Sequence, residues 1–288
     1  MESKTRRVIQ IIEPQAVVEG AGVRLKRSLG GRALDYLDPF LLLDHFDSKN
    51  PQDYQAGFPL HPHRGIETVT YVVSGEVKHK DSLGNSGSIG AGDVQWMTAG
   101  RGILHEEMPQ VQPQGVSGFQ LWVNLAAKEK MTAPRYQDIS ANEIPEITRA
   151  DGTRIRVITG TLDGVSGPVS GISVAPTYLD VSIPAGVTFA HPVARGHSAF
   201  TYVFNGAVNV RAAKNDADVM VQSPMLLVWG EGDEIQIAAT KSPARLLLVS
   251  GAPLNEPISR YGPFVMNTRA EIEATVRELQ NGTFPPTS

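Results

Sequence analysis

The chain of 288 residues has no cysteine, which excludes disulfide bridges, cysteine-bound zinc clusters and thiol catalysis. It has no apolar run near the roughly 18–20 residues that a membrane-spanning helix needs, and its start, MESKTRR, lacks the apolar core of a signal peptide. Basic residues cluster only in KTRR at 4–7, and the formal net charge is −4, which argues against direct nucleic-acid binding. These absences predict a cytoplasmic protein without membrane or nucleic-acid contacts.

The residues that are present favour an all-β fold. Hydrophobic residues make up 41% and charged residues 19% of the chain, as in globular proteins, and 28 glycines with 20 prolines indicate many turns. Short runs rich in valine, isoleucine and tyrosine end in turn-forming residues. We expect strands at 67–73, 76–79, 93–97, 119–125, 154–160, 178–183, 201–204, 208–211, 225–229, 234–238 and 245–250.

The chain repeats itself once. The segment TYVVSG at 70–75 is echoed by TYVFNG at 201–206, a displacement of 131 residues, and VQW at 94–96 is echoed by LVW at 227–229, a displacement of 133. A nearly constant displacement across two strands indicates a duplicated β unit. We therefore expect two tandem β-barrels. The expected domains are residues 1–135 and 150–288, with the link between them near 131–152.

A C-terminal α-helix is expected within the second domain. Thr268 and Glu271 form a capping box, Ile272, Val276 and Leu279 are spaced to make an apolar stripe, and Asn281-Gly282 provides a stop.

Four residues form a candidate metal site. Alternate residues of a strand point to the same face, so His61 and His63 can direct two imidazoles at one point. His105 and Glu107 can do the same from a second strand. Three histidines and a carboxylate suit a divalent transition metal and leave positions for a substrate or water.

The surrounding residues resemble known motifs. Gly57, His61, His63, Glu67 and Gly75 are similar to the first motif of the cupin superfamily, and residues 92–105 resemble the second, although Thr98 replaces its usual proline and the histidine comes two residues late. Three longer segments are similar to the pirin family of bicupins. These segments are GFPLHPHRGIETV at 57–69, DVQWMTAGRGILHEEMP at 93–109 and YGPFVMNT at 261–268.

The resemblance to pirins implies a bicupin whose N-terminal barrel holds one metal ion. The ligands carried over from that family are His61, His63, His105 and Glu107, with Fe(II) the first expectation and copper, nickel, manganese or zinc the alternatives. Glu67 stands where many other cupins place a carboxylate ligand, and here it is left to support the site or the fold.

The repeat predicts a second barrel without metal. The displacements place Pro192 and Ala194 at the positions of His61 and His63. They also place Ala238 and Thr240 at the positions of His105 and Glu107, and none of these residues replaces a ligand in kind.

Other histidines and arginines are weaker candidates. His191 and His197 are expected in loops or at the surface, and His79, between two lysines, on a solvated strand face. His45 either lines the pocket mouth or is structural. Arg64 and Arg101 flank the ligands, and each either orients an acid or is an exposed or turn-bracing arginine.

Two functions are compatible with this site. Resemblance to pirins implies a quercetin 2,3-dioxygenase-type oxidoreductase that opens a flavonol-like substrate with dioxygen, with Glu107 removing the proton of the metal-bound hydroxyl. Flavonols would then be either the natural substrate or mimics of another enol or catechol. The alternative is a redox-sensing regulator whose metal controls binding to a transcription factor or metabolic enzyme.

Overall fold

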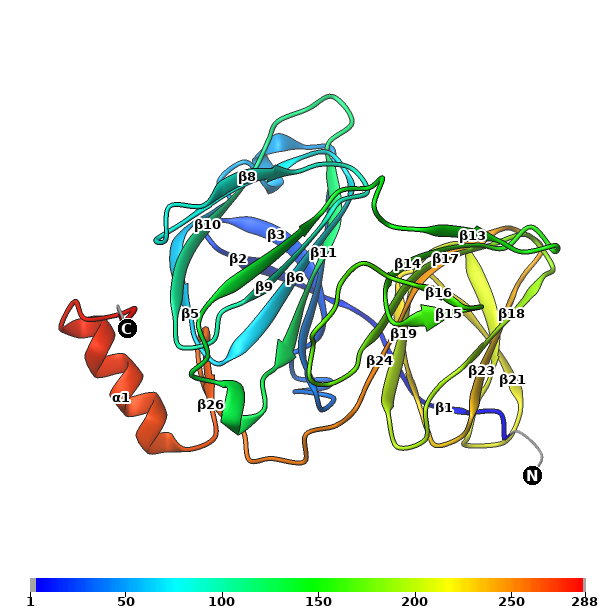
Figure 1. Ribbon diagram of the computed structural model, residues 1–288. Coiled ribbons are helices and arrows are strands. Elements are labelled where there is room, and N and C mark those ends of the chain that lie inside the picture. The colour runs from blue at the N-terminus through cyan, green and yellow to red at the C-terminus, as the bar shows by residue number, and fades with distance from the viewer. Residues whose placement is uncertain (1–3, 287–288) are drawn as a thin grey trace. The chain divides into compact units, whose positions relative to one another are not determined.

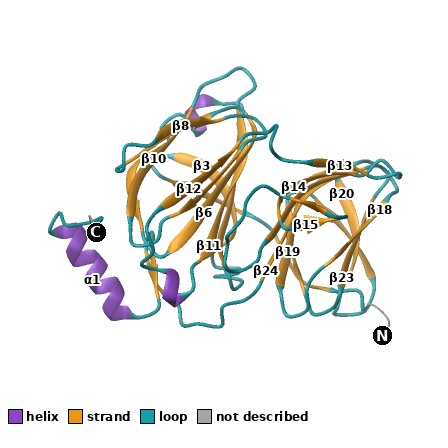
Figure 2. Cartoon of the chain, viewed as in Figure 1, coloured by secondary structure: helices purple, strands orange, loops and turns teal. Residues whose placement is uncertain are grey.

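The computed structural model describes residues 4–286 and confirms the all-β fold with a C-terminal α-helix (Figures 1 and 2). The described chain divides into two compact units. The first barrel unit comprises residues 15–141 and 254–286, and the second barrel unit comprises residues 4–14 and 142–253.

The first barrel unit contains two antiparallel sheets. One has the strand order β12-β9-β6-β11-β4-β3-β2, and the other has the order β5-β10-β7-β8. The strands are β2 (Gln15–Glu19), β3 (Val23–Leu29), β4 (Phe40–Ser48), β5 (Phe58–His63), β6 (Ile66–Ser74), β7 (Val77–Asp81), β8 (Ser86–Ile89), β9 (Val94–Thr98), β10 (Ile103–Pro109), β11 (Val116–Asn124) and β12 (Arg135–Ile139). Two 3-10 turns (Pro51–Asp53 and Ala127–Glu129), the hairpin β25 (Ser259–Tyr261) with β26 (Phe264–Met266), and helix α1 (Arg269–Gln280) complete the unit.

The second barrel unit has the same plan. Its sheets have the orders β1-β22-β19-β24-β17-β14-β13 and β18-β23-β20-β21, with a small β15-β16 pair beside them. The strands are β1 (Val8–Ile12), β13 (Glu146–Thr148), β14 (Arg154–Thr159), β15 (Thr161–Leu162), β16 (Val165–Ser166), β17 (Thr177–Ile183), β18 (Thr188–Pro192), β19 (Ser198–Asn205), β20 (Ala207–Arg211), β21 (Asp218–Gln222), β22 (Met225–Trp229), β23 (Glu234–Ala239) and β24 (Ala244–Gly251).

The predicted tandem repeat is confirmed by these matching orders, but the constant displacement does not hold at the site. In the first unit His61 pairs with His105. In the second unit Ala238 pairs with Thr188, and Pro192 pairs with Glu234. His61 and His105 are paired across two strands, but Pro192 and Ala238 are not paired with each other, so they cannot both be the counterparts of these histidines. The reason is that the segments that connect the strands differ in length between the two halves.

Each unit also takes one terminal segment of the chain, so the units differ from the expected ranges 1–135 and 150–288. Strand β1 pairs with β22 and covers a sheet edge that would otherwise expose unpaired backbone groups. The C-terminal segment joins the first unit, because the Val265 amide donates to the Arg64 carbonyl (3.1 Å) and the Lys130 ammonium donates to the Val265 carbonyl (2.9 Å). The helix therefore lies in the first unit.

The two barrels differ in what fills them. The second unit has one large apolar core, in which β18 and β23 bury Phe189, Ile235 and Ile237. In the first unit the equivalent strands β5 and β10 carry histidines, and the apolar residues form separate clusters, one around Phe46 and Val72 and another around Ile66 and Ile103. The first unit thereby retains a cavity.

Helix α1 begins as the sequence predicts. Thr268 is the N-cap, and its side chain and that of Glu271 form the reciprocal capping box. Ile272 is buried and Val276 packs beside it, but Leu279 is 39% exposed, so the apolar stripe ends one turn early. The helix has 12 residues, and among the described residues no helix combines the length and apolarity required to cross a membrane.

Arg64 anchors this helix, and we expect its replacement to loosen the helix. Its buried guanidinium donates to the Arg101 carbonyl (2.6 Å), the Thr275 hydroxyl (2.9 Å) and the Glu278 carboxylate (2.5 Å). Hydrogen bonds to charged groups contribute about 1.5–3 kcal/mol each, so Arg64→Ala should speed amide exchange in α1 by about tenfold or more. Hydrogen exchange with mass spectrometry measures this. Arg269→Ala, at an exposed position of α1, is the control, and equal exchange in the two variants would contradict the anchoring role.

Candidate metal centre

Two neighbouring antiparallel strands place three histidines together. His61 and His63 lie on β5, His105 lies on β10, and His105 is directly opposite His61. The ring centroids are 4.5 Å apart for His61 and His105, 4.9 Å for His61 and His63, and 5.1 Å for His63 and His105. One nitrogen from each ring lies within 4.8 Å of the others, so the three imidazoles can hold a metal ion.

The protonation state of these rings fits a metal. Burial lowers the pKa of His63 to about 3 and that of His105 well below its ordinary value, so both rings are neutral near pH 7 and keep a nitrogen lone pair. Neither ring nitrogen of His105 has a hydrogen-bond partner, although the residue is buried. A buried polar atom without a partner is costly. A cation that accepts one lone pair from each of the three rings would give one nitrogen of His105 a partner, so these residues fit a divalent transition metal.

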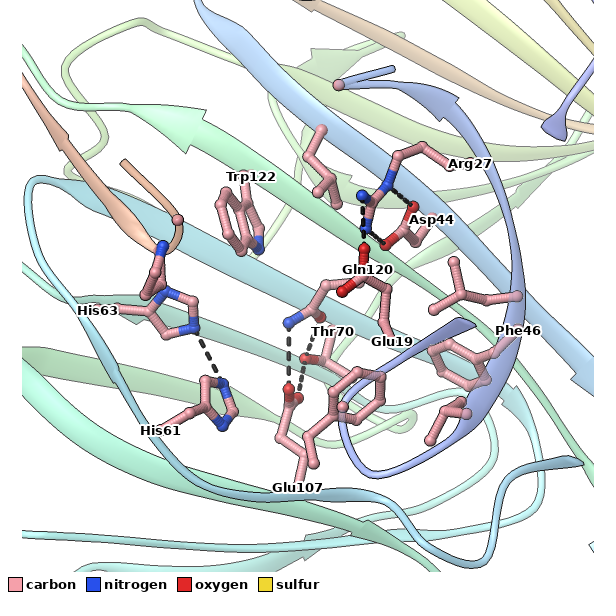
Figure 3. Close-up of a pocket in the computed structure, with 18 of the residues that line it drawn as sticks. Glu19, Arg27, Asp44, Phe46, His61, His63, Thr70, Glu107, Gln120 and Trp122 are labelled. Carbon is pink, nitrogen blue, oxygen red and sulfur yellow. Dashed lines mark hydrogen bonds and ion pairs between the residues drawn. The ribbon is translucent and has the colours of Figure 1, made fainter. Parts of the chain in front are cut away.

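Glu107 is held separately, on the same strand. A β-bulge separates it from His105 in the pairing with β5. Its carboxylate accepts hydrogen bonds from the Thr70 hydroxyl (2.8 Å) and the Gln120 side-chain amide (3.2 Å), as Figure 3 shows. Three nitrogens therefore converge, while the Glu107 carboxylate is positioned by strands β6 and β11.

These residues border a cavity of about 1070 Å³ in the first unit. His61, His63 and Glu107 line it, with apolar side chains such as Phe46 and the indole of Trp122 (Figure 3). A mostly apolar cavity of this size with a few convergent polar groups is typical of a small-molecule site.

Glu67 has a different environment. It is buried on β6, its carboxylate accepts a hydrogen bond from Thr98 (2.8 Å), and it is not among the described residues that line the cavity. Burial raises the pKa of Glu67 to about 7. Its carboxyl group therefore belongs to the barrel wall.

This raised pKa predicts a pH-dependent stability. The folded state favours protonated Glu67, so folding takes up a proton between the ordinary pKa of 4.5 and about 7, and the free energy of unfolding falls as the pH rises through this window. Glu67→Gln imitates the protonated form. The free energy of unfolding of the unmodified chain should therefore fall relative to that of Glu67→Gln as the pH rises from 5 to 8. We expect this relative change to be on the order of 3 kcal/mol in urea unfolding. The control is Glu273→Gln on the exposed face of α1. Parallel pH profiles for Glu67→Gln and the unmodified chain would refute the prediction.

The structure corrects two histidine predictions. His79 is only 7% exposed and contacts Gln95, because strand alternation turns it inward while Lys78 and Lys80 face outward. His191 is also buried, on β18 beside Phe189, and is not a surface residue.

Two further candidates, His45 and Arg64, have structural environments. His45 is buried on β4 and stacks on Phe119 (4.6 Å between ring centroids), which favours the structural alternative. Arg64 is not exposed and does not line the cavity, because its guanidinium donates to the Arg101 carbonyl and to Thr275 and Glu278 of α1.

Sequence reasoning missed the residues that support Glu107 and line the rest of the cavity. Thr70 and Gln120 are cross-strand partners, and each is a polar residue between two buried apolar neighbours, which was a usable signal. No comparable signal marked Trp122 or the paired Arg27 and Asp44, which line the same cavity (Figure 3).

Comparisons with known proteins cover both units. Residues 22–123 match the family model described as Pirin, and residues 178–285 match the one described as Pirin C-terminal cupin domain. A pirin-like protein of Caulobacter vibrioides is 44% identical over 280 residues, covering 97% of this chain and 99% of the relative. Human pirin is 42% identical over 267 residues, covering 91% of this chain and 88% of its own.

A solved structure extends the likeness to three dimensions. The crystal structure of a quercetin 2,3-dioxygenase from Acinetobacter baumannii has a TM-score of 0.87 and 35% sequence identity, and the match covers 98% of this chain and 99% of that one. Together with the two family models and the matching strand orders, this similarity shows that the chain belongs to the pirin family of bicupins.

Proposed function

We propose that the first barrel unit is a metal-dependent dioxygenase of the pirin type, which opens the ring of a flavonol-like enol. Its metal is Fe(II), and its nitrogen ligands are the converging His61, His63 and His105. Glu107, carried over from the family as the fourth ligand, is held by Thr70 and Gln120 and serves as the base. The observation that carries the proposal is the convergence of three imidazoles, two of which (His61 and His63) line a cavity of about 1070 Å³. Similarity to the Acinetobacter baumannii quercetin 2,3-dioxygenase supports the substrate class.

A backbone contact orients one of the ligands. The Nδ1 atom of His61 lies 2.9 Å from the carbonyl oxygen of Pro59. Because a carbonyl only accepts, Nδ1 carries the proton, and the Nε2 lone pair is left for the site. This Nε2 lies 3.1 Å from Nε2 of His63, an arrangement that suits two lone pairs shared with one cation.

Glu107 is suited to accept a proton. Both of its oxygens receive hydrogen bonds, from Thr70 and Gln120, which hold the carboxylate at the cavity wall. A divalent metal bound by the imidazoles would act as a Lewis acid on an enolic hydroxyl and lower its pKa. Glu107 would take that proton, and the apolar wall around Phe46 and Trp122 would exclude bulk water from the deprotonated substrate.

The reaction is tested with the metal-loaded protein. Reconstitution with Fe(II) and addition of quercetin should give loss of the flavonol absorbance, matched by uptake of one dioxygen and release of one carbon monoxide per flavonol. Both atoms of dioxygen remain in the ring-opened product, so no external reductant is needed. Absence of turnover with fully loaded metal would reject this substrate.

A further inference from the structure

The cavity contains an arginine, Arg260, that forms no ion pair among the described residues, although the carboxylates of Asp35, Asp44 and Glu19 interact with its charge. Arg260 lies on β25, is exposed and lines the cavity. Its guanidinium carbon sits 5.1 Å from the centre of the Trp122 ring, and one terminal nitrogen is 3.4 Å from the Leu41 carbonyl oxygen, which is long for a hydrogen bond. Within residues 4–286, no carboxylate forms an ion pair with it. Its N–H donors are therefore available to a ligand.

The neighbouring arginine shows the contrast. Arg27 donates to both carboxylate oxygens of Asp44 (2.8 and 2.7 Å) and forms a second ion pair with Glu19 (2.8 Å). These two carboxylates are committed to Arg27. Asp35 also lines the cavity but forms no ion pair with Arg260 among the described residues. Arg260 is thus the guanidinium that can receive an anion from the cavity.

Trp122 connects this guanidinium to the imidazoles. The ring of His63 meets its indole edge-on at 5.1 Å, and Arg260 lies over the same indole at 5.1 Å. Stacking on an aromatic ring holds a guanidinium in place while its in-plane donors stay free. An aromatic ligand with one oxygen at the imidazoles would extend along Trp122 toward Arg260.

We propose that Arg260 selects substrates that carry a carboxylate or another oxyanion on an aromatic body, at the end opposite the metal-binding hydroxyl. The inference rests on the proposed function for the orientation of the substrate. Recognition itself requires no turnover, because it comes from charge-assisted hydrogen bonds to the guanidinium.

The test is a binding measurement with a matched ligand pair. Isothermal titration calorimetry of the Fe(II)-loaded protein without oxygen compares 6-hydroxy-2-naphthoate with the neutral 6-hydroxy-2-naphthamide. We expect the acid to bind at least about tenfold more tightly, the lower end of what a hydrogen bond to a charged group contributes. Arg260→Gln should remove this preference, and Arg260→Lys should keep part of it. The control is Arg269→Gln, outside the cavity on α1, which should keep all of it.

The outcomes separate this inference from the proposed function. Equal affinity for acid and amide, no binding of either, or a preference that survives in Arg260→Gln would overturn the role of Arg260. Failure of quercetin turnover would reject the proposed reaction, yet an acid preference that depends on Arg260 would still establish anion recognition in the cavity.

Discussion

His105→Ala is expected to lower the affinity for Fe(II) by more than about a hundredfold and to abolish turnover. Loss of an outer partner of a metal ligand already costs about 10–100-fold in affinity, and loss of a ligand costs more. His105 has two buried ring nitrogens without protein partners, and a bound cation would give one of them a partner, so the substitution removes a ligand that the fold keeps free for the metal. Metal content after dialysis against a chelator, measured by mass spectrometry, reports the change.

The matched control is His45→Ala. His45 is another buried histidine of the first unit, stacked on Phe119 and absent from the converging group. The His45→Ala variant should keep its metal, even if it unfolds at a lower temperature. Retention of metal in His105→Ala, or equal loss in both variants, would reject the three-histidine site.

Glu107→Gln is expected to reduce kcat by about 10²–10⁴, the usual contribution of a positioned general base. The three imidazoles remain, so the loss of metal should be smaller than in His105→Ala. Glutamine keeps the volume of the side chain between Thr70 and Gln120 but cannot take a proton from an enol. Steady-state oxygen uptake, with metal content measured on the same samples, separates the two effects.

Glu67→Gln provides the comparison for this variant. Both residues are buried carboxyls of the first unit, but Glu67 bonds to Thr98 and lies outside the cavity wall. The kcat of Glu67→Gln should stay within about twofold of that of the unmodified chain, since glutamine imitates the protonated form of Glu67. A kcat for Glu107→Gln within tenfold of the unmodified value would show that another group accepts the proton.

Several features could be predicted because they depend on short-range geometry. Alternation along a strand places His61 and His63 on one face. The capping box at Thr268 starts a helix regardless of which unit the helix packs against. Two echoed strands were enough to show the repeat, which the matching sheet orders confirm.

The failures share a cause. Two flanking lysines suggested a solvated face for His79, and His191 was expected in a loop or at the surface, but burial depends on which strand and which layer cover a face. The displacements of 131 and 133 failed near Pro192 and Ala238, because the segments that connect the strands differ in length between the two halves.

The sequence by itself determined the β fold, the duplication, the pirin membership and the three histidines that are candidate ligands, since each is written in short sequence patterns. Only the tertiary structure decided which barrel keeps a cavity, that Thr70 and Gln120 hold Glu107, that Arg260 faces the same cavity, and that the terminal segments are exchanged between units. These features arise from contacts between residues far apart in the chain, and such contacts form only when sheets pair and close.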